Sequence, residues 1–334
     1  MAIDVPVELK VRGPAGPAPL RRPGSVRRTS TIDMRWPAGP GTQLRLTGRA
    51  RDLLTPADES APVVLAEDTM TVGVHPMTRT IEDISAHPPR SALSALVGAR
   101  GGGNSRALLA EVMAGEAEAG TPLYLMLDDI AGASLIAGFA YSRWIPRPQL
   151  ELAMASAPKR NMEGICTGFQ PGSGALMPDG SSKWNHQVRP VGPLAREDDP
   201  LGWHDLEEIT EISMRRARRI DVAVGDVIEI DSMFQDSSTV PEGGRVAVHE
   251  YLVRATADPV TGELLSLAAD PRVLPYDECP LASAAVGAIV GTPLRELRAA
   301  VLKKFPGTAG CTHLNDAMRA LAEVPALVAS LRAR

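Results

Sequence analysis

The chain has 334 residues, of which 44% are apolar and 4% aromatic, and its formal charge is -5 at pH 7. That length is enough for two ordinary domains, and the weak negative charge with few aromatic side chains argues against nucleic acid as a partner. Three cysteines are too few for a disulfide framework, no run of eighteen or more apolar residues occurs, and the first residues lack the apolar stretch of a signal peptide. We therefore expect a cytoplasmic protein without a membrane partner.

The chain opens with residues 1–24, which are rich in proline, glycine and arginine. Such a composition buries little apolar surface and predicts a disordered N-terminal arm. Predicted strands come next, and predicted helices follow them up to residue 144. Residues 25–144 are therefore expected to form a first folded module.

An internal repeat is the strongest feature of the sequence. The segments SVRRTSTIDM at residues 25–34 and SMRRARRIDV at residues 213–222 share half of their residues, position for position. The likeness continues through Asp52 and Asp236, and the turn residues and apolar positions that follow keep the same order. Ordered self-similarity of this kind predicts one module copied in tandem, with the second copy over residues 213–334.

Residues 145–212 connect the two copies and are rich in proline, glycine and serine. They also carry Cys166, Phe169, Trp184 and Trp203, which are side chains that favour burial. We therefore expect an ordered bridging segment that wraps the pair of modules rather than a flexible tether.

In the second copy, alternating apolar residues over 246–253 predict a half-buried strand. Helices are predicted over residues 280–290, 294–304 and 314–331, after the strands. The basic run at residues 214–219 is interpreted as the solvated edge of a strand or helix. The predicted fold class is α+β, with each module a mostly antiparallel sheet that has helices packed on one face.

Only the second copy keeps a group of residues suited to chemistry. Cys311 and His313 come just before a predicted helix, whose free N–H groups would stabilise a thiolate and lower the pKa of Cys311, with His313 as proton carrier. The predicted strand places His249 and Tyr251 on one face and Glu250 on the other. The full set of candidate catalytic residues is Asp236, His249, Glu250, Tyr251, Cys311, His313 and Asp316.

Structural roles are the alternative for the same residues. Thr312 would cap the helix with Asn315 or Asp316, Cys311 would fill the core, and His249 would be an ordinary sheet residue. A metal site is a further alternative, because Cys279 also precedes a helix. Cys279, Cys311 and His313 would then bind zinc, although no Cys-x-x-Cys spacing is present. No other cofactor is expected.

Two resemblances to known families follow from these motifs. The stretch LPYDECP at residues 274–280, followed by GCTHLND at residues 310–316, resembles the bacterial family called domain of unknown function 2889 over about residues 213–325. That family implies no activity. The order of strands, helices and cysteines is also similar to the iron-sulfur scaffold fold, in which two ligand cysteines would match Cys279 and Cys311. The third ligand cysteine of that fold is missing here.

We expect a cytoplasmic enzyme that performs acid-base chemistry of the lyase, isomerase or hydratase type. Its substrate would be a small apolar or aromatic metabolite, bound in a cleft between the two modules. The alternative is a metal-binding or sulfur-carrier protein that uses Cys279, Cys311 and His313. A structural or regulatory role is a further alternative, and a second copy of the chain, in a homodimer, is a candidate partner.

Overall fold

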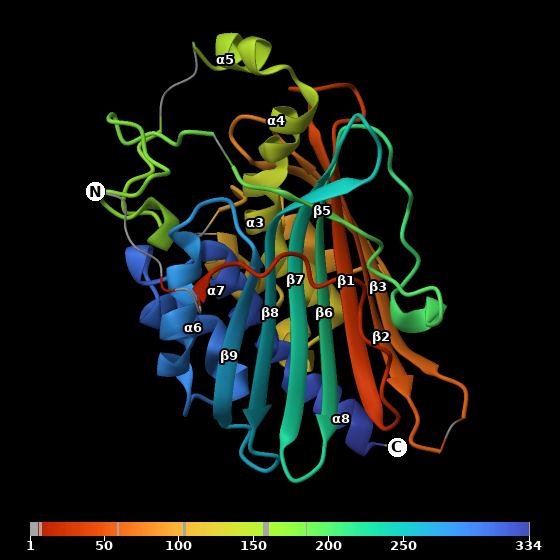
Figure 1. The fold of residues 1–334 in the computed structure, drawn as a ribbon. Coiled ribbons are helices and arrows are strands. Elements are labelled where there is room, and N and C mark those ends of the chain that lie inside the picture. The colour runs from red at the N-terminus through yellow and green to blue at the C-terminus, as the bar shows by residue number, and fades with distance from the viewer. Residues whose placement is uncertain are drawn as a thin grey trace.

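The computed structural model describes residues 6, 9–58, 60–102, 105–155, 160–184 and 186–333. Four strands precede a set of helices, and after a bridge the same order is repeated (Figure 1). The strands are β1 (Ser25–Arg35), β2 (Leu44–Thr55), β3 (Val63–Val74), β4 (Ile81–His87), β5 (Arg189–Val191), β6 (Met214–Val224), β7 (Ile228–Thr239), β8 (Arg245–Ala257) and β9 (Leu264–Val273). The α-helices are α1 (Ser105–Val112), α2 (Ala114–Ala119), α3 (Pro122–Ile136), α4 (Tyr141–Trp144), α5 (Arg147–Ala155), α6 (Leu297–Lys304), α7 (Thr312–Arg319) and α8 (Val324–Arg332).

All of these strands join one antiparallel sheet in the order β4-β3-β2-β1-β6-β7-β8, and β5 and β9 both pair with β8. The predicted α+β class with antiparallel pairing is confirmed. The two modules do not keep separate sheets, however, because β1 pairs with β6 along its length. In that pairing Ser30 lies opposite Arg218, which is its counterpart in the sequence repeat.

Two matching ion pairs lie toward opposite ends of the paired strands β1 and β6. Arg27 donates to both carboxylate oxygens of Asp221, and Arg215 donates in the same way to Asp33. Arg27 and Arg215 are equivalent in the repeat, and so are Asp33 and Asp221. Contacts that repeat with their roles exchanged are the pattern of a two-fold symmetric interface.

The helices cover one face of the sheet, as predicted (Figure 1). Two large apolar clusters fill this interface, one built mainly from the first half of the chain and one mainly from the second. The helix predicted at residues 280–290 is a 3-10 helix, Cys279–Ile289. The helix predicted at residues 314–331 is divided into α7, a short 3-10 helix at Ala320–Glu323, and α8.

The opposite face of the sheet is covered by irregular segments rather than by helices. The arm that was expected to be disordered runs across this face in its described part, from residue 9 to 24 (Figure 1). Its backbone is held there, because Ala15 donates to Glu250 and Ala18 donates to Leu194. The bridge contributes Trp203, which is fully buried in a small apolar cluster on this side.

The basic run at residues 214–219 was predicted to be solvated, and this prediction is wrong. Arg215, Arg216, Arg218 and Arg219 are all buried in β6. Alternation along the strand sends them to both faces of the sheet, and each meets a carboxylate there. Burial of these charges is tolerated because each is paired.

One continuous helical stretch in the described part of the chain, Pro122–Trp144, is long and apolar enough to cross a membrane by length and composition. In this fold its most apolar window is 72% buried inside the protein. Asp128 and Asp129 lie within it and pair with Arg319 and Arg218. Those ion pairs explain how two neighbouring carboxylates fit into an apolar core helix.

The buried His204 gives a stability prediction. Its ring nitrogens lie 2.9 and 2.8 Å from the hydroxyls of Thr29 and Thr31, and burial, with nearby arginines, lowers its pKa to about 3. An unfolded histidine has a pKa near 6.5, so acid favours the unfolded chain below that pH. We expect His204 alone to cost about 2 kcal/mol of stability between pH 6.5 and pH 5.

Urea unfolding at pH 7 and pH 5 measures this effect. The His204→Gln variant is expected to lose less stability on acidification than the unmodified protein, by about the same 2 kcal/mol. An equal loss in both proteins would show that His204 is not held neutral.

Candidate metal centre

The site begins as a row of side chains across three strands. In the sheet register Arg216 of β6 lies opposite Asp236 of β7, and Asp236 lies opposite His249 of β8. Directly opposed residues of antiparallel strands point to the same face, so all three side chains meet on the helix side. A bulge follows at once, because the register shifts between Asp236 and Ser237. Bulges of this kind redirect side chains next to functional sites.

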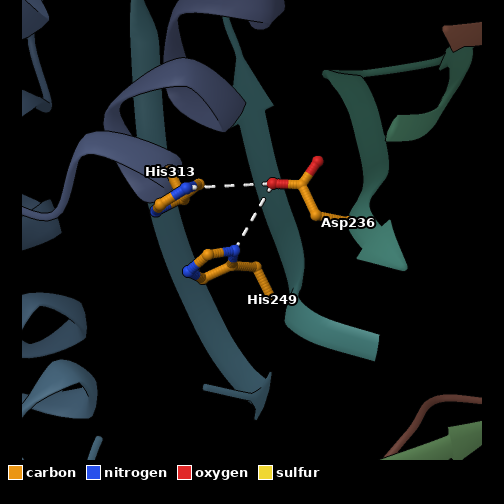
Figure 2. A group of neighbouring side chains, drawn as sticks. All are labelled: Asp236, His249 and His313. Atoms are coloured by element: carbon orange, nitrogen blue, oxygen red, sulfur yellow. Dashed lines mark ion pairs between the residues drawn. The ribbon is translucent and has the colours of Figure 1, made fainter. Parts of the chain in front are cut away.

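His313 reaches the row from the helix layer. It lies in the first turn of α7, and its Nε2 is 3.8 Å from Oδ2 of Asp236. Nδ1 of His249 is 3.4 Å from the same oxygen. The two imidazole rings are stacked with 3.4 Å between their centroids, so both rings turn a nitrogen toward one carboxylate (Figure 2).

The spacing of these three atoms suits a metal ion. They all lie within 4.8 Å of one another, and no other such group of ligands is found among the described residues. In a tetrahedral zinc site with bonds of about 2.0–2.1 Å, neighbouring ligand atoms are about 3.4 Å apart. Moreover, Nδ1 of His249 is buried and has no hydrogen-bond partner, although it faces Asp236. A metal ion would supply the missing partner of that nitrogen.

The protonation states also suit a metal. Burial would raise the pKa of Asp236, but the charge of Arg216, the neighbouring His249 and the hydrogen bonds of Arg216 outweigh it and hold that pKa well below its ordinary range. Burial lowers the pKa of His249, and it lowers the pKa of His313 further, helped by the neighbouring His249. At neutral pH the site therefore holds one carboxylate and two neutral imidazoles, which are the forms that bind metals.

Arg216 was not among the predicted site residues. Its Nε and one Nη donate to the two oxygens of Asp236 at 2.9 and 3.0 Å. Its other Nη donates to Asp129 at 3.2 Å and to Asp316 at 3.3 Å. The predicted Asp316 thus lies behind the site as a partner of Arg216, and it also accepts from Arg106.

This contact is part of a larger charged network between the sheet and the helices. Its links run from α3 and the C-terminal helices to β1 and β6, so both halves of the chain contribute. Arginines and carboxylates occur in equal number, which keeps the buried layer neutral. The members are Arg28, Arg106, Arg216, Arg218, Arg298 and Arg319 with Asp52, Asp128, Asp129, Asp236, Asp316 and Glu323.

Comparison with known proteins places the site within a defined region of the chain. Residues 214–327 match the family model described as "Protein of unknown function (DUF2889)". The match begins in β6 and ends in α8, and it contains Asp236, His249 and His313. The resemblance predicted for this part of the sequence is confirmed. No curated protein and no solved structure matches the chain.

Outside the DUF2889 region, the first half of the chain repeats the row without its imidazoles. Asp52 accepts from Arg28 through both oxygens, as Asp236 does from its own arginine. Asp52 lies opposite Ala66 where Asp236 lies opposite His249, and a register shift follows Asp52 as well. The carboxylate and its arginine are therefore common to both halves, whereas the imidazoles of His249 and His313 have no counterpart beside Asp52.

The cysteines of the DUF2889 region lie apart from this group of ligands. Thr312 is the first residue of α7 rather than its cap, so the predicted capping role of Thr312 is wrong; Cys311 holds the N-cap position, and its thiol contacts Tyr251. Burial raises the pKa of Cys311, and it raises that of Cys279 further. The prediction of a lowered pKa at Cys311 is therefore wrong, because desolvation outweighs the N–H groups of the helix. Cys166 of the bridge lies nearby, and burial raises its pKa to about 12.

Tyr251 and Glu250, the two remaining predicted residues, lie on opposite faces of the sheet, as the alternation along the strand indicated. Tyr251 is buried on the helix face, whereas Glu250 points to the opposite face. There Glu250 accepts from the Gln235 amide at 2.8 Å and from the backbone N–H of Ala15 at 2.6 Å. Glu250 therefore holds the N-terminal arm through a hydrogen bond, and its side chain lies on the face of the sheet opposite to that of His249.

A surface hollow of about 500 Å³ lies elsewhere in the second half of the chain. It is lined by Ile228, by the turn at residues 259–262 and by α8, at the opposite end of β7 from Asp236. All of its lining residues belong to the second half of the chain. The predicted cleft between the modules is therefore not this hollow.

Proposed function

We propose that the protein binds one divalent transition-metal ion through Oδ2 of Asp236, Nδ1 of His249 and Nε2 of His313. The observation that carries the proposal is the convergence of these three atoms, with spacings of 3.4 and 3.8 Å to the shared carboxylate oxygen. Two imidazoles and one carboxylate are a ligand set used by zinc and by non-haem iron(II). The bidentate contact with Arg216 supports it by fixing the carboxylate.

Such a centre suits the acid-base chemistry expected of an enzyme here. Three protein ligands leave a coordination position for water or substrate, and a bound metal lowers the pKa of that water to about 7. The water would then exchange protons with a small molecule in a lyase, hydratase or isomerase reaction. A water or small molecule would reach the site from the side of His313, because that side chain is 18% exposed whereas Asp236 is fully buried.

An aromatic cluster around His186, within electrostatic range of His249, supports the proposal of an apolar or aromatic substrate. The ring of His186 contacts those of Phe139, Trp184 and Tyr276. Burial lowers the pKa of His186 to about 4, with a further contribution from nearby His249. A neutral, aromatic surrounding of this kind favours the binding of flat apolar groups.

The origin of the site is explained by a tandem duplication, which we propose for the chain. The matching pairs Arg27–Asp221 and Arg215–Asp33 support it, since their roles are exchanged across β1 and β6. The shared contact between arginine and carboxylate in both halves supports it independently. On this proposal the second copy kept or gained two imidazoles, and the first copy serves as scaffold.

A sulfur-carrier or iron-sulfur scaffold role is less well supported. Both need a thiolate, and the pKa values of Cys166, Cys279 and Cys311 are all raised by burial. His313 also points to Asp236 rather than to the thiols.

Metal analysis tests the proposed function directly. Purified protein is expected to hold one zinc or iron ion per chain, and the metal-free protein to bind added Co²⁺ with the visible spectrum of a nitrogen and oxygen site. The His249→Ala variant should lose the ion, whereas Cys279→Ser should keep it. If the unmodified protein holds none of these metals and takes up no Co²⁺, the proposal is wrong. Loss of the ion in Cys279→Ser instead would move the site to the thiols.

A further inference from the structure

The carboxylate of the metal centre depends on a contact that crosses from one half of the chain to the other. Arg216 uses one edge of its guanidinium for Asp236 and the other for Asp129, which belongs to α3 in the first half. Asp129 is itself fixed, because Arg218 donates to both of its oxygens. The guanidinium therefore has no free edge and is fully buried.

A glycine in α3 makes this contact sterically feasible. A Cβ atom at Gly132 would lie 2.1 Å from Nη1 of Arg216 and 2.8 Å from Oδ2 of Asp316. Glycine is unfavourable within a helix by about 1 kcal/mol relative to alanine, so its place in the middle of α3 needs a packing reason. Close approach of the guanidinium to the helix backbone is that reason.

We infer that Arg216 is a positioning residue of the metal centre, held in place by Asp129 and by the space at Gly132. The inference rests on the proposed function and assigns the first half of the chain, which supplies none of the three metal ligands, a role in it. Both oxygens of Asp236 accept from Arg216, and Oδ2 is also the oxygen that faces His249 and His313. A shift of the guanidinium would rotate the carboxylate and move Oδ2 away from the two imidazoles.

The Gly132→Ala variant tests the inference by Co²⁺ titration of the metal-free protein. Loss of partners that orient a metal ligand costs about 10- to 100-fold in metal affinity, and we expect a loss in that range with an altered visible spectrum. Gly115→Ala is the matched control, because Gly115 also lies in a helix of the first half and a Cβ there meets no atom within 4 Å. That variant should keep the affinity and the spectrum of the unmodified protein.

A second variant covers the case in which Gly132→Ala does not fold. Asp129→Asn keeps the shape of the side chain but removes the charge that holds Arg216, and it should weaken Co²⁺ binding and alter the spectrum in the same direction. If the unmodified protein binds Co²⁺ and the folded variants bind it equally well with the same spectrum, Arg216 is not positioned from the first half. If the unmodified protein binds no Co²⁺, the metal centre itself is wrong and the inference falls with it.

Discussion

Replacing Arg216 by methionine is expected to destabilise the protein by about 3–5 kcal/mol. Methionine preserves much of the length of the side chain, so the main loss is the buried positive charge. Asp236, Asp129 and Asp316 would then lie close together in the core without that counter-charge. Urea unfolding at pH 7 measures the difference in the free energy of unfolding.

Arg254→Met is the matched control for that experiment. Arg254 also pairs with a carboxylate, Asp231, but its side chain is 74% exposed. Solvent screens such pairs, so we expect a change of about 0–1 kcal/mol. A loss at Arg216 no larger than the loss at Arg254 would contradict the view that the buried network depends on its arginines.

The fold class was accessible from the sequence because its signals are local. Alternation over residues 246–253 and the apolar pattern of the later helices are set by neighbouring residues, and the structure has a strand and helices there. The local sequence patterns do not predict that the strands of both modules form one sheet. The pairing of β1 with β6 joins segments far apart in the chain, and the order of elements in each module is the same with one sheet or two.

Part of the candidate site could also be found from the sequence. Asp236, His249 and His313 are all among the predicted catalytic residues. The predicted metal ligands were instead Cys279 and Cys311 with His313, because cysteines are common zinc ligands and both precede a helix.

The register of the β7–β8 hairpin does not supply the missing information by itself, because the pairing of Ser237 with Ala247 would continue to Asp236 with Val248. The bulge between Asp236 and Ser237 is what places His249 opposite Asp236, and no residue pattern in the sequence indicated it.

Arg216 was missed for a different reason. A short basic run is usually solvated, so the arginines of β6 gave no functional signal on their own. The repeat held the better signal, because an arginine is conserved between the copies at Arg28 and Arg216, and an aspartate at Asp52 and Asp236. Two charges retained together through a repeat indicate a paired contact, and the structure shows that pair in both halves.

Cys166 is expected to react with iodoacetamide at pH 8 about a thousandfold more slowly than an ordinary thiol. Burial raises its pKa from 9.0 to about 12, so the reactive thiolate falls from roughly one molecule in ten to one in ten thousand. The rate is measured on a variant that carries Cys279→Ser and Cys311→Ser and keeps Cys166 alone. The same variant unfolded in urea is the control and should react at an ordinary rate. A native rate equal to the unfolded one would show that the Cys166 thiol is available as a thiolate and that burial does not raise its pKa.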